Sequence, residues 1–115
     1  MTSEKFSKSD RILKRETFRR VYENGRKIQF RYFTAFVLTN AIGTARVGIT
    51  ATKKIGNSVE RNRARRLVRE AFRRNKWLGS HGVDIVVNVK RQLVEAGYRD
   101  FEVEFKSFLE KASEK

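Results

Sequence analysis

The chain has 115 residues and a formal net charge of +14 at pH 7, with no cysteine and one histidine. The length fits one domain over residues 1–115 with one modest core, and residues 1–11 and 112–115 are expected to be flexible. Without cysteine there is no disulfide framework, thiolate metal site or cysteine nucleophile, and one histidine makes neither a metal cluster nor a catalytic triad, so we expect no catalytic residues and no metal ligands.

The excess of positive charge indicates a polyanionic partner. Lys and Arg number 27 against 13 Asp and Glu, and nucleic acid is the commonest polyanion that such a domain meets. A membrane surface is the weaker alternative, because it needs a basic helix whose apolar face has no other core to fill. No apolar run is long enough to span a bilayer and the polar start is not a signal peptide, so we expect a cytoplasmic protein without a membrane partner.

Residues 13–25 are predicted to form a short helix. Phe18, Val21 and Tyr22 are spaced three and four residues apart and share one face, and Gly25 is a typical C-terminal stop. From this spacing alone, Phe18 and Tyr22 would belong to the core.

Residues 28–39 are predicted to form a strand that can divide into two near Arg31. Both of its faces are largely apolar, so we expect it to be covered on two sides. A second strand over residues 45–52 alternates apolar and polar side chains. Gly48 in this strand allows either close approach of an RNA backbone or tight packing.

A basic turn over residues 53–58 precedes the longest predicted helix. This helix runs from Val59 to about Trp77 without glycine or proline inside, and we expect Trp77 to pack at its end. Asn57 or Ser58 can cap its N-terminus.

The last predicted elements are a strand over residues 83–89 and a helix from Asp100, its expected N-cap. His81, in the loop before this strand, is given no function. Glu102 and Glu104 are placed in the first turn of the helix, where the helix dipole favours acids. The order αββ(β)αβα predicts the α+β class, a two-layer α/β sandwich with helices on a small mixed sheet. Phe101, Phe105 and Phe108 fall at helical spacing with Leu109, and these three phenylalanines are expected in the core.

The long helix separates apolar from basic side chains. At about 100° per residue, its apolar residues gather on one arc that faces the core. The opposite side carries a straight stripe of Asn62, Arg66, Arg69 and Arg73, flanked by Arg61 and Arg65 on one edge and by Arg63 and Arg74 on the other.

This stripe indicates a polyanion-binding face. Solvated helix faces usually mix signs, whereas like charges one turn apart, such as Arg65 and Arg69, cost roughly a few tenths of a kcal/mol per pair. Guanidinium groups are always charged and offer paired donors that match phosphate oxygens. A face that is merely solvated is the alternative.

The ordered motifs around this stripe resemble the signature of the bacterial ribonuclease P protein family. The similarity covers roughly residues 12–90, and it is far more specific than a basic helix alone. The motifs are Phe18–Gly25, Arg46–Ile49, Lys53–Val59, Arg61–Arg63 and Arg65–Phe72.

The resemblance implies a fold and a function. The fold has a left-handed crossover at the long helix, against the general preference for a right-handed one. The function is that of the protein subunit of ribonuclease P, which assists Mg²⁺-dependent endonucleolytic removal of the 5′ leader from precursor tRNA, while the RNA subunit carries the chemistry. Mg²⁺ would be bound mainly by the RNA and none by the protein alone. The implied partners are ribonuclease P RNA and precursor tRNA, without an obligate protein partner.

The resemblance also implies two RNA-binding surfaces. One surface would bind the RNA subunit, and the other is a cleft for the single-stranded leader, whose bases stack on aromatic faces without a fixed sequence. The aromatic residues of this cleft, placed in the core from their spacing alone, are therefore expected to be partly exposed. The residues matched to RNA-subunit binding are Lys53, Lys54, Asn57, Arg61, Asn62, Arg63, Arg66 and Arg69, and those matched to leader binding are Phe18, Tyr22, Phe36, Thr50 and Arg65.

Two other functions fit the size, the charge and the fold class. A structural ribosomal protein would bind one rRNA site, and a DNA-binding module would place the basic helix in a major groove. The aromatic residues of the cleft distinguish these functions from the first, because a duplex reader needs no aromatic platform and a ribosomal protein does not bind varied single strands.

Overall fold

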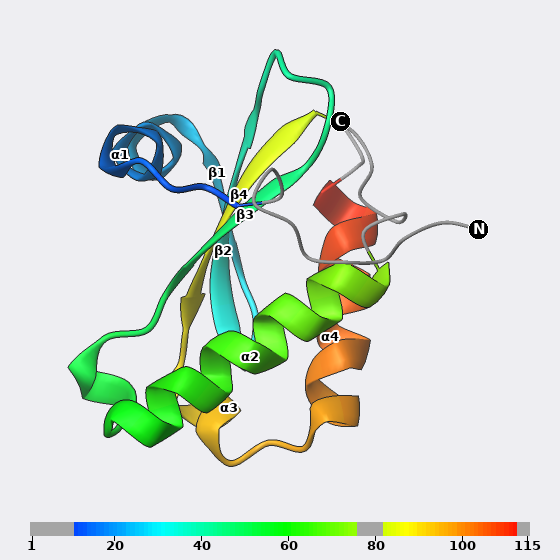
Figure 1. Cartoon of the computed structure of the whole chain (residues 1–115). Coiled ribbons are helices and arrows are strands. Elements are labelled where there is room, and N and C mark those ends of the chain that lie inside the picture. Colours follow the sequence, from blue (N-terminus) through cyan, green and yellow to red (C-terminus); the bar gives the residue numbers. More distant parts are fainter. Residues whose placement is uncertain (1–10, 76–81, 113–115) are drawn as a thin grey trace.

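The computed structural model describes residues 11–75 and 82–112 (Figure 1). The predictions for Trp77, for His81 and for most of the two flexible ends lie outside these residues. In chain order the elements are α1 (Arg15–Asn24), β1 (Arg26–Gln29), β2 (Phe33–Thr39), β3 (Arg46–Thr50), the 3₁₀ helix η2 (Lys53–Ile55), α2 (Ser58–Asn75), β4 (Val83–Val89), α3 (Arg91–Val94) and α4 (Tyr98–Ala112).

The four strands form one mixed sheet in the order β1-β2-β4-β3. β2 is antiparallel to both β1 and β4, whereas β3 is parallel to β4. Parallel strands need a crossover connection, and here the chain passes from β3 to β4 through η2 and α2. The predicted α+β class and the division of the first strand are confirmed, and the hand of the crossover stays a prediction.

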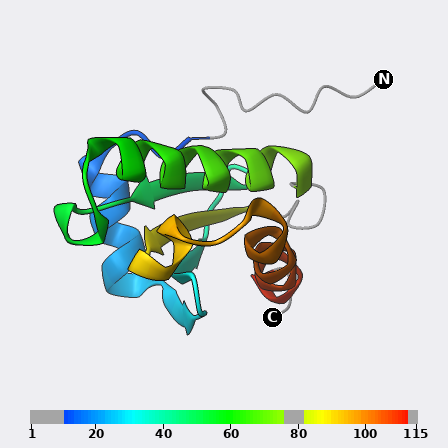
Figure 2. The ribbon, with the colours of Figure 1, turned by 90° about the horizontal axis from the view of Figure 1, so that it is seen from below.

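The main core lies between one face of the sheet and helices α2 and α4 (Figures 1 and 2). Alternate residues of β2, beginning with Phe33, point to this face and are buried. The rings of Phe101, Phe105 and Phe108 on α4 lie 5.7 to 5.8 Å from the ring of Phe33, centroid to centroid. Aromatic pairs of this kind contribute about 0.5–1.5 kcal/mol each beyond their buried area.

Helix α4 begins two residues earlier than predicted. Its first hydrogen bond runs from the backbone N–H of Phe101 to the carbonyl oxygen of Gly97 at 3.2 Å, so the helix starts at Tyr98. Asp100 is therefore not the N-cap. It lies in the first turn, where the helix dipole also favours an acid. The short helix α3, Arg91–Val94, was not predicted.

Glu102 and Glu104 lie beyond the first turn in which they were predicted, and both accept hydrogen bonds from other elements. Glu104 accepts from the backbone N–H groups of Arg31 and Tyr32, at 3.2 and 2.9 Å. Glu102 accepts from the side-chain amide of Asn75 at 2.9 Å. These carboxylates therefore join α4 to the turn between β1 and β2 and to the C-terminal end of α2.

Helix α1 packs against the opposite face of the sheet from α2 and α4 (Figure 1). Val21 of α1 and Val86 of β4 are fully buried in this contact, and Phe18 and Tyr22 are half-buried beside them. The helix ends at the predicted glycine, because the N–H of Gly25 donates to the carbonyl oxygen of Val21 at 2.8 Å.

The register of the two parallel strands determines which of their side chains face α1. Side chains alternate along each strand, so every second residue of β3 and of β4 points to this face. The aligned pairs on it are Arg46 with Asp84, Gly48 with Val86, and Thr50 with Asn88.

The first of these pairs is an ion pair between a half-buried arginine and a buried aspartate. Arg46 donates from Nε and Nη2 to the two carboxylate oxygens of Asp84, at 2.8 and 2.7 Å, and the side-chain amide of Asn40 donates to the same carboxylate at 2.8 Å. Asp84 is only 2% exposed. A buried carboxylate needs such partners, and these join the loop after β2 to the sheet.

Candidate RNA interface

A reciprocal cap sets the start of α2. The side-chain oxygen of Asn57 accepts from the N–H of Glu60, and the carboxylate of Glu60 accepts from the N–H of Asn57, both at 2.9 Å. This is a capping box, and of the two predicted caps it selects Asn57. The guanidinium of Arg61 adds a hydrogen bond to the carbonyl oxygen of Gly56 at 3.0 Å. The turn before α2 is therefore held firmly to the helix.

The face of α2 opposite the core presents cations to solvent. Arg66 and Arg69 are exposed, and neither has a carboxylate partner within residues 11–75 and 82–112. The pKa of Arg69 is lower than its ordinary value, chiefly because the side chain is partly buried and also because the positive charges of Arg11 and Arg65 are nearby. These like charges around Arg69 repel one another and attract an anion.

Two other arginines of α2 bind groups of the protein itself. Arg63 donates to the backbone carbonyl oxygens of Val94 and Ala96, at 2.9 and 3.0 Å, and so joins α2 to the segment around the end of α3. Arg73 forms an ion pair with Glu70 at 2.6 Å, and this hydrogen bond lowers the pKa of Glu70. The open part of the predicted stripe is therefore its middle.

The exposed basic surface continues from α2 onto η2. Lys53 and Lys54 of η2 are exposed beside the N-terminus of α2, and Asn62 on the first turns of α2 is exposed as well. All eight residues predicted to bind the RNA subunit therefore lie on η2, on the cap or on α2. Arg63 is set apart from the others by its bonds to the α3 side.

An aromatic cluster lies between α1 and the sheet. The rings of Tyr22 and Phe36 meet edge to face, with centroids 4.9 Å apart and planes at 81°. The Tyr22 hydroxyl donates to Asn88 Oδ1 at 2.6 Å and is hydrogen-bonded to Thr50 Oγ1 at 2.9 Å. Tyr22 and Phe36 are both half-buried. The tyrosine is thus held at its hydroxyl while part of its ring stays accessible.

Phe18 connects this cluster to α2. A Cβ atom on Gly48 would come within 2.6 Å of the Phe18 ring, so tight packing accounts for the glycine in β3. A hollow of about 150 Å³ opens beside this contact, and Phe18, Gly48, Arg65 and Arg69 help to line it. The structure therefore brings Phe18 of α1 and Arg65 of α2 to the same hollow, next to the cluster that contains the other three predicted leader-binding residues.

Asn88 was not predicted to take part in the site, although the pattern of β4 carries a signal for it. Asp84 and Asn88 are the only polar residues of β4, and their spacing of four places both on one face of the strand. Polar side chains in a nearly buried strand need partners, so the pair could have been predicted to serve a polar group on the α1 side.

Within the described part of the chain, no three histidine, aspartate or glutamate side chains gather where they could hold a metal ion. None of the described helices is long and apolar enough to cross a membrane. The groups that this surface offers to a partner are guanidinium and ammonium donors and half-buried aromatic rings.

Comparison with known proteins identifies the family. The sequence model of the Ribonuclease P family matches residues 6–113. The chain belongs to the ribonuclease P protein family. The ribonuclease P protein component of Syntrophus aciditrophicus is 42% identical over 93 residues, which cover 81% of this chain and 78% of that one. The component from Thermotoga maritima is 36% identical over 93 residues, covering 81% and 80%.

Solved structures of ribonuclease P proteins share the fold. The Staphylococcus aureus protein superposes with a TM-score of 0.81 at 30% identity, covering 91% of this chain and 96% of that one. The Thermotoga maritima protein gives a TM-score of 0.81 at 30% identity, covering 88% and 96%. Ribonuclease P proteins are subunits of an endoribonuclease that processes the 5′ end of tRNA and works with ribonuclease P RNA. The family resemblance and the fold class predicted from the sequence are confirmed.

Proposed function

We propose that this protein assists Mg²⁺-dependent removal of the 5′ leader from precursor tRNA by binding both the catalytic RNA and the leader. The observation that carries the proposal is that Arg66 and Arg69 are exposed and without carboxylate partners among the described residues, and that Arg69 shares a hollow with the half-buried ring of Phe18. Membership of the ribonuclease P family supports it.

The α2 surface is assigned to the RNA subunit. Guanidinium groups one helical turn apart can follow a phosphate backbone, because each offers paired donors to phosphate oxygens. The exposed side chains of Lys53 and Lys54 extend this surface at the start of α2. Each phosphate that is neutralised releases counterions, so this contact should weaken steeply with salt.

The cleft between α1 and the sheet is assigned to the single-stranded leader. Phe18, Tyr22 and Phe36 are half-buried there, so each presents part of its ring to solvent. Stacking of one base on an aromatic side chain contributes about 1–3 kcal/mol and tolerates any base. Such a site accepts the varied leaders of different precursor tRNAs. Arg65, at the border of the hollow beside Phe18, can neutralise a leader phosphate.

The chemistry is assigned to the RNA subunit in the cytoplasm, and Mg²⁺ to its phosphates. The described residues gather no carboxylate cluster that fits a hard cation, and the guanidinium groups of α2 repel one. The contribution of the protein is positive charge and stacking, which hold two RNA molecules together. No further protein is needed in this arrangement.

Reconstitution tests the proposal. Precursor tRNA is incubated at low Mg²⁺ with a bacterial ribonuclease P RNA, with the protein, or with both. We expect leader removal to be fast only with both, because protein cations replace part of the metal ions that screen the two RNAs. Robust cleavage by the protein without RNA would contradict the proposal, as would the absence of any stimulation.

A further inference from the structure

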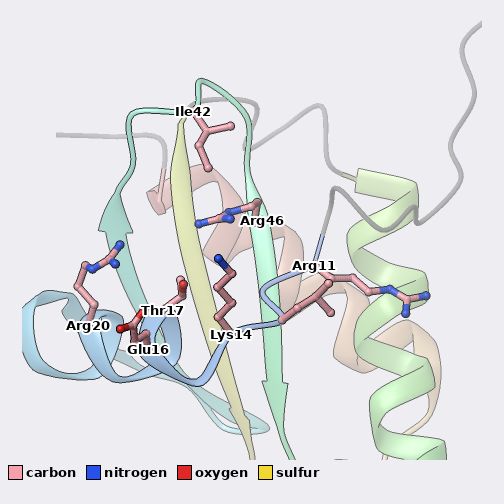
Figure 3. Close-up of a pocket in the computed structure, with 8 residues that line it drawn as sticks. Arg11, Lys14, Glu16, Thr17, Arg20, Ile42 and Arg46 are labelled. Carbon is pink, nitrogen blue, oxygen red and sulfur yellow. The ribbon is translucent and has the colours of Figure 1, made fainter.

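Helix α1 crosses the strands of the sheet, and side chains of the helix and of the residue before it reach β3 in three steps (Figure 3). The steps fall on alternate residues of β3, which share the face turned to α1. The first step is a hydrogen bond at 2.9 Å, the second is a ring packed over a glycine, and the third is a pair of cations at one hollow. The three steps are Tyr22 with Thr50, Phe18 with Gly48, and Lys14 with Arg46.

The third step opens into a hollow of about 460 Å³, a volume typical of ligand pockets (Figure 3). Figure 3 shows the Lys14 side chain extending toward Arg46, with Arg20 on α1 to the left and Ile42, on the loop after β2, above Arg46. None of the residues assigned above to RNA-subunit binding or to leader binding lines this basic hollow.

The charges that line the basic hollow favour an anion. Arg46 is compensated by its ion pair with Asp84, and Glu16 contributes one carboxylate. Lys14 and Arg20 are exposed, and neither forms an ion pair with any of the residues that the structure describes. Positive side chains that are exposed and uncompensated at a concave surface concentrate the field on a bound phosphate.

The basic hollow is contiguous with the hollow at the leader cleft. Arg11 and Leu13 line both, so only the segment before α1 separates them. Two apolar side chains border the basic hollow and are well exposed, Leu13 at 61% and Ile42 at 56%. Apolar edges beside cations suit a nucleotide, whose base and phosphate need different surroundings.

We propose that the basic hollow is a second subsite for single-stranded RNA, which binds the phosphate backbone of leader nucleotides upstream of those stacked in the cleft. This inference rests on the proposed function. The direction follows from β3, whose end at Thr50 leads to η2 and the surface assigned to the catalytic RNA. Nucleotides close to the cleavage site therefore lie near Tyr22, and nucleotides further upstream reach Lys14.

Leader length provides the test. Holoenzyme is reconstituted with a bacterial ribonuclease P RNA, and its Kd is measured for precursor tRNAs with leaders of about 4 and about 12 nucleotides, within the range of single-strand site sizes. In the double variant Lys14→Ala/Arg20→Ala we expect weaker binding of the long leader alone. The slope of log affinity against log salt should fall by about 0.7 for each lost phosphate contact. The matched control is Arg99→Ala/Lys106→Ala, which removes two exposed cations of α4.

Two outcomes would overturn the subsite. If the double variant binds the long leader with unchanged affinity, the basic hollow does not bind RNA, and it serves either a protein partner or no partner. An equal loss for both leaders would assign Lys14 and Arg20 to another part of the RNA. The proposed function fails separately, if the wild-type holoenzyme binds precursor tRNA no better than mature tRNA. Equal thermal unfolding of the variants and the wild type ensures that the comparison reports binding.

Discussion

Asn88 Oδ1 accepts a hydrogen bond of 2.6 Å from the hydroxyl of Tyr22, and this bond fastens α1 to the middle of the sheet. The two residues are 66 positions apart, and the bond holds the tyrosine at its outer end. The rings of Tyr22 and Phe36 meet edge to face, so the orientation of the tyrosine is fixed before any ligand arrives. A preorganised ring loses little conformational entropy when a base stacks on it.

Replacing Tyr22 by alanine should weaken binding of precursor tRNA and spare mature tRNA, because only the precursor carries a leader. The expected loss is about 1–3 kcal/mol, the contribution of one stacked base. Titration of both tRNAs onto the holoenzyme measures it. Tyr22→Phe is the control, since it keeps the ring and loses about 1 kcal/mol of unfolding free energy with the hydroxyl. Equal losses for both tRNAs would contradict a leader cleft.

Replacing Arg66 and Arg69 by alanine should weaken binding of the RNA subunit and flatten its salt dependence. Both side chains are exposed, so the expected change is in RNA contacts and not in folding. The slope of log affinity against log salt should fall by about 0.7–0.9 for each lost phosphate contact. Arg99→Ala on α4 serves as the control for loss of charge alone. A slope equal to that of the wild type would show that these two arginines do not touch phosphate.

Substitution Gly48→Ala should lower both stability and leader affinity. The new Cβ atom would meet the Phe18 ring at 2.6 Å, and overpacking of this kind typically costs about 1–3 kcal/mol. The ring must move, so the leader surface changes with it. Urea unfolding and precursor tRNA binding measure the two effects. Gly97→Ala is the control, because nothing lies within 4 Å of its added Cβ atom. Wild-type values for Gly48→Ala would contradict the packing described for Phe18.

Stability should fall at alkaline pH through Tyr98. Its burial, then the charge of Glu102 and the hydrogen bond to it, raise the pKa of Tyr98 from 10.0 to about 12. Between these pH values the folded protein keeps a proton that the unfolded chain has lost, so the contribution is present below pH 10 and disappears toward pH 12. Urea unfolding across this window should show a steeper decline for the wild type than for Tyr98→Phe. Parallel declines would rule this contribution out.

The basic stripe of α2 could be predicted because it depends on local periodicity alone. Residues at helical spacing share a face whatever surrounds the helix, and the buried residues of α2, such as Val68 and Phe72, lie on the predicted arc. The aromatic face of α1 was predicted in the same way. Spacing could not predict that this face is partly exposed, because core residues and cleft residues follow the same pattern. That prediction came from the family resemblance.

Features that depend on distant parts of the chain escaped sequence analysis. The carbonyl partners of Arg63 lie 31 and 33 residues away, next to α3, which at four residues is too short to show a period. The contact between Arg46 and Asp84 spans 38 residues and exists because β3 is parallel to β4. Hydrophobic alternation identifies strands, but it does not say which strands are neighbours.

The ion pair between Arg46 and Asp84 also fixes the alignment of β3 along β4. Sliding β3 by one position would turn the guanidinium into the apolar core. Sliding it by two would leave the buried carboxylate of Asp84 without its cation, at a cost of about 3–5 kcal/mol. Neighbouring alignments of the strand are therefore far less stable than the observed one. The same ion pair therefore also determines where α1 meets β3, because this alignment brings Thr50 to the hydroxyl of Tyr22 and Gly48 to the ring of Phe18.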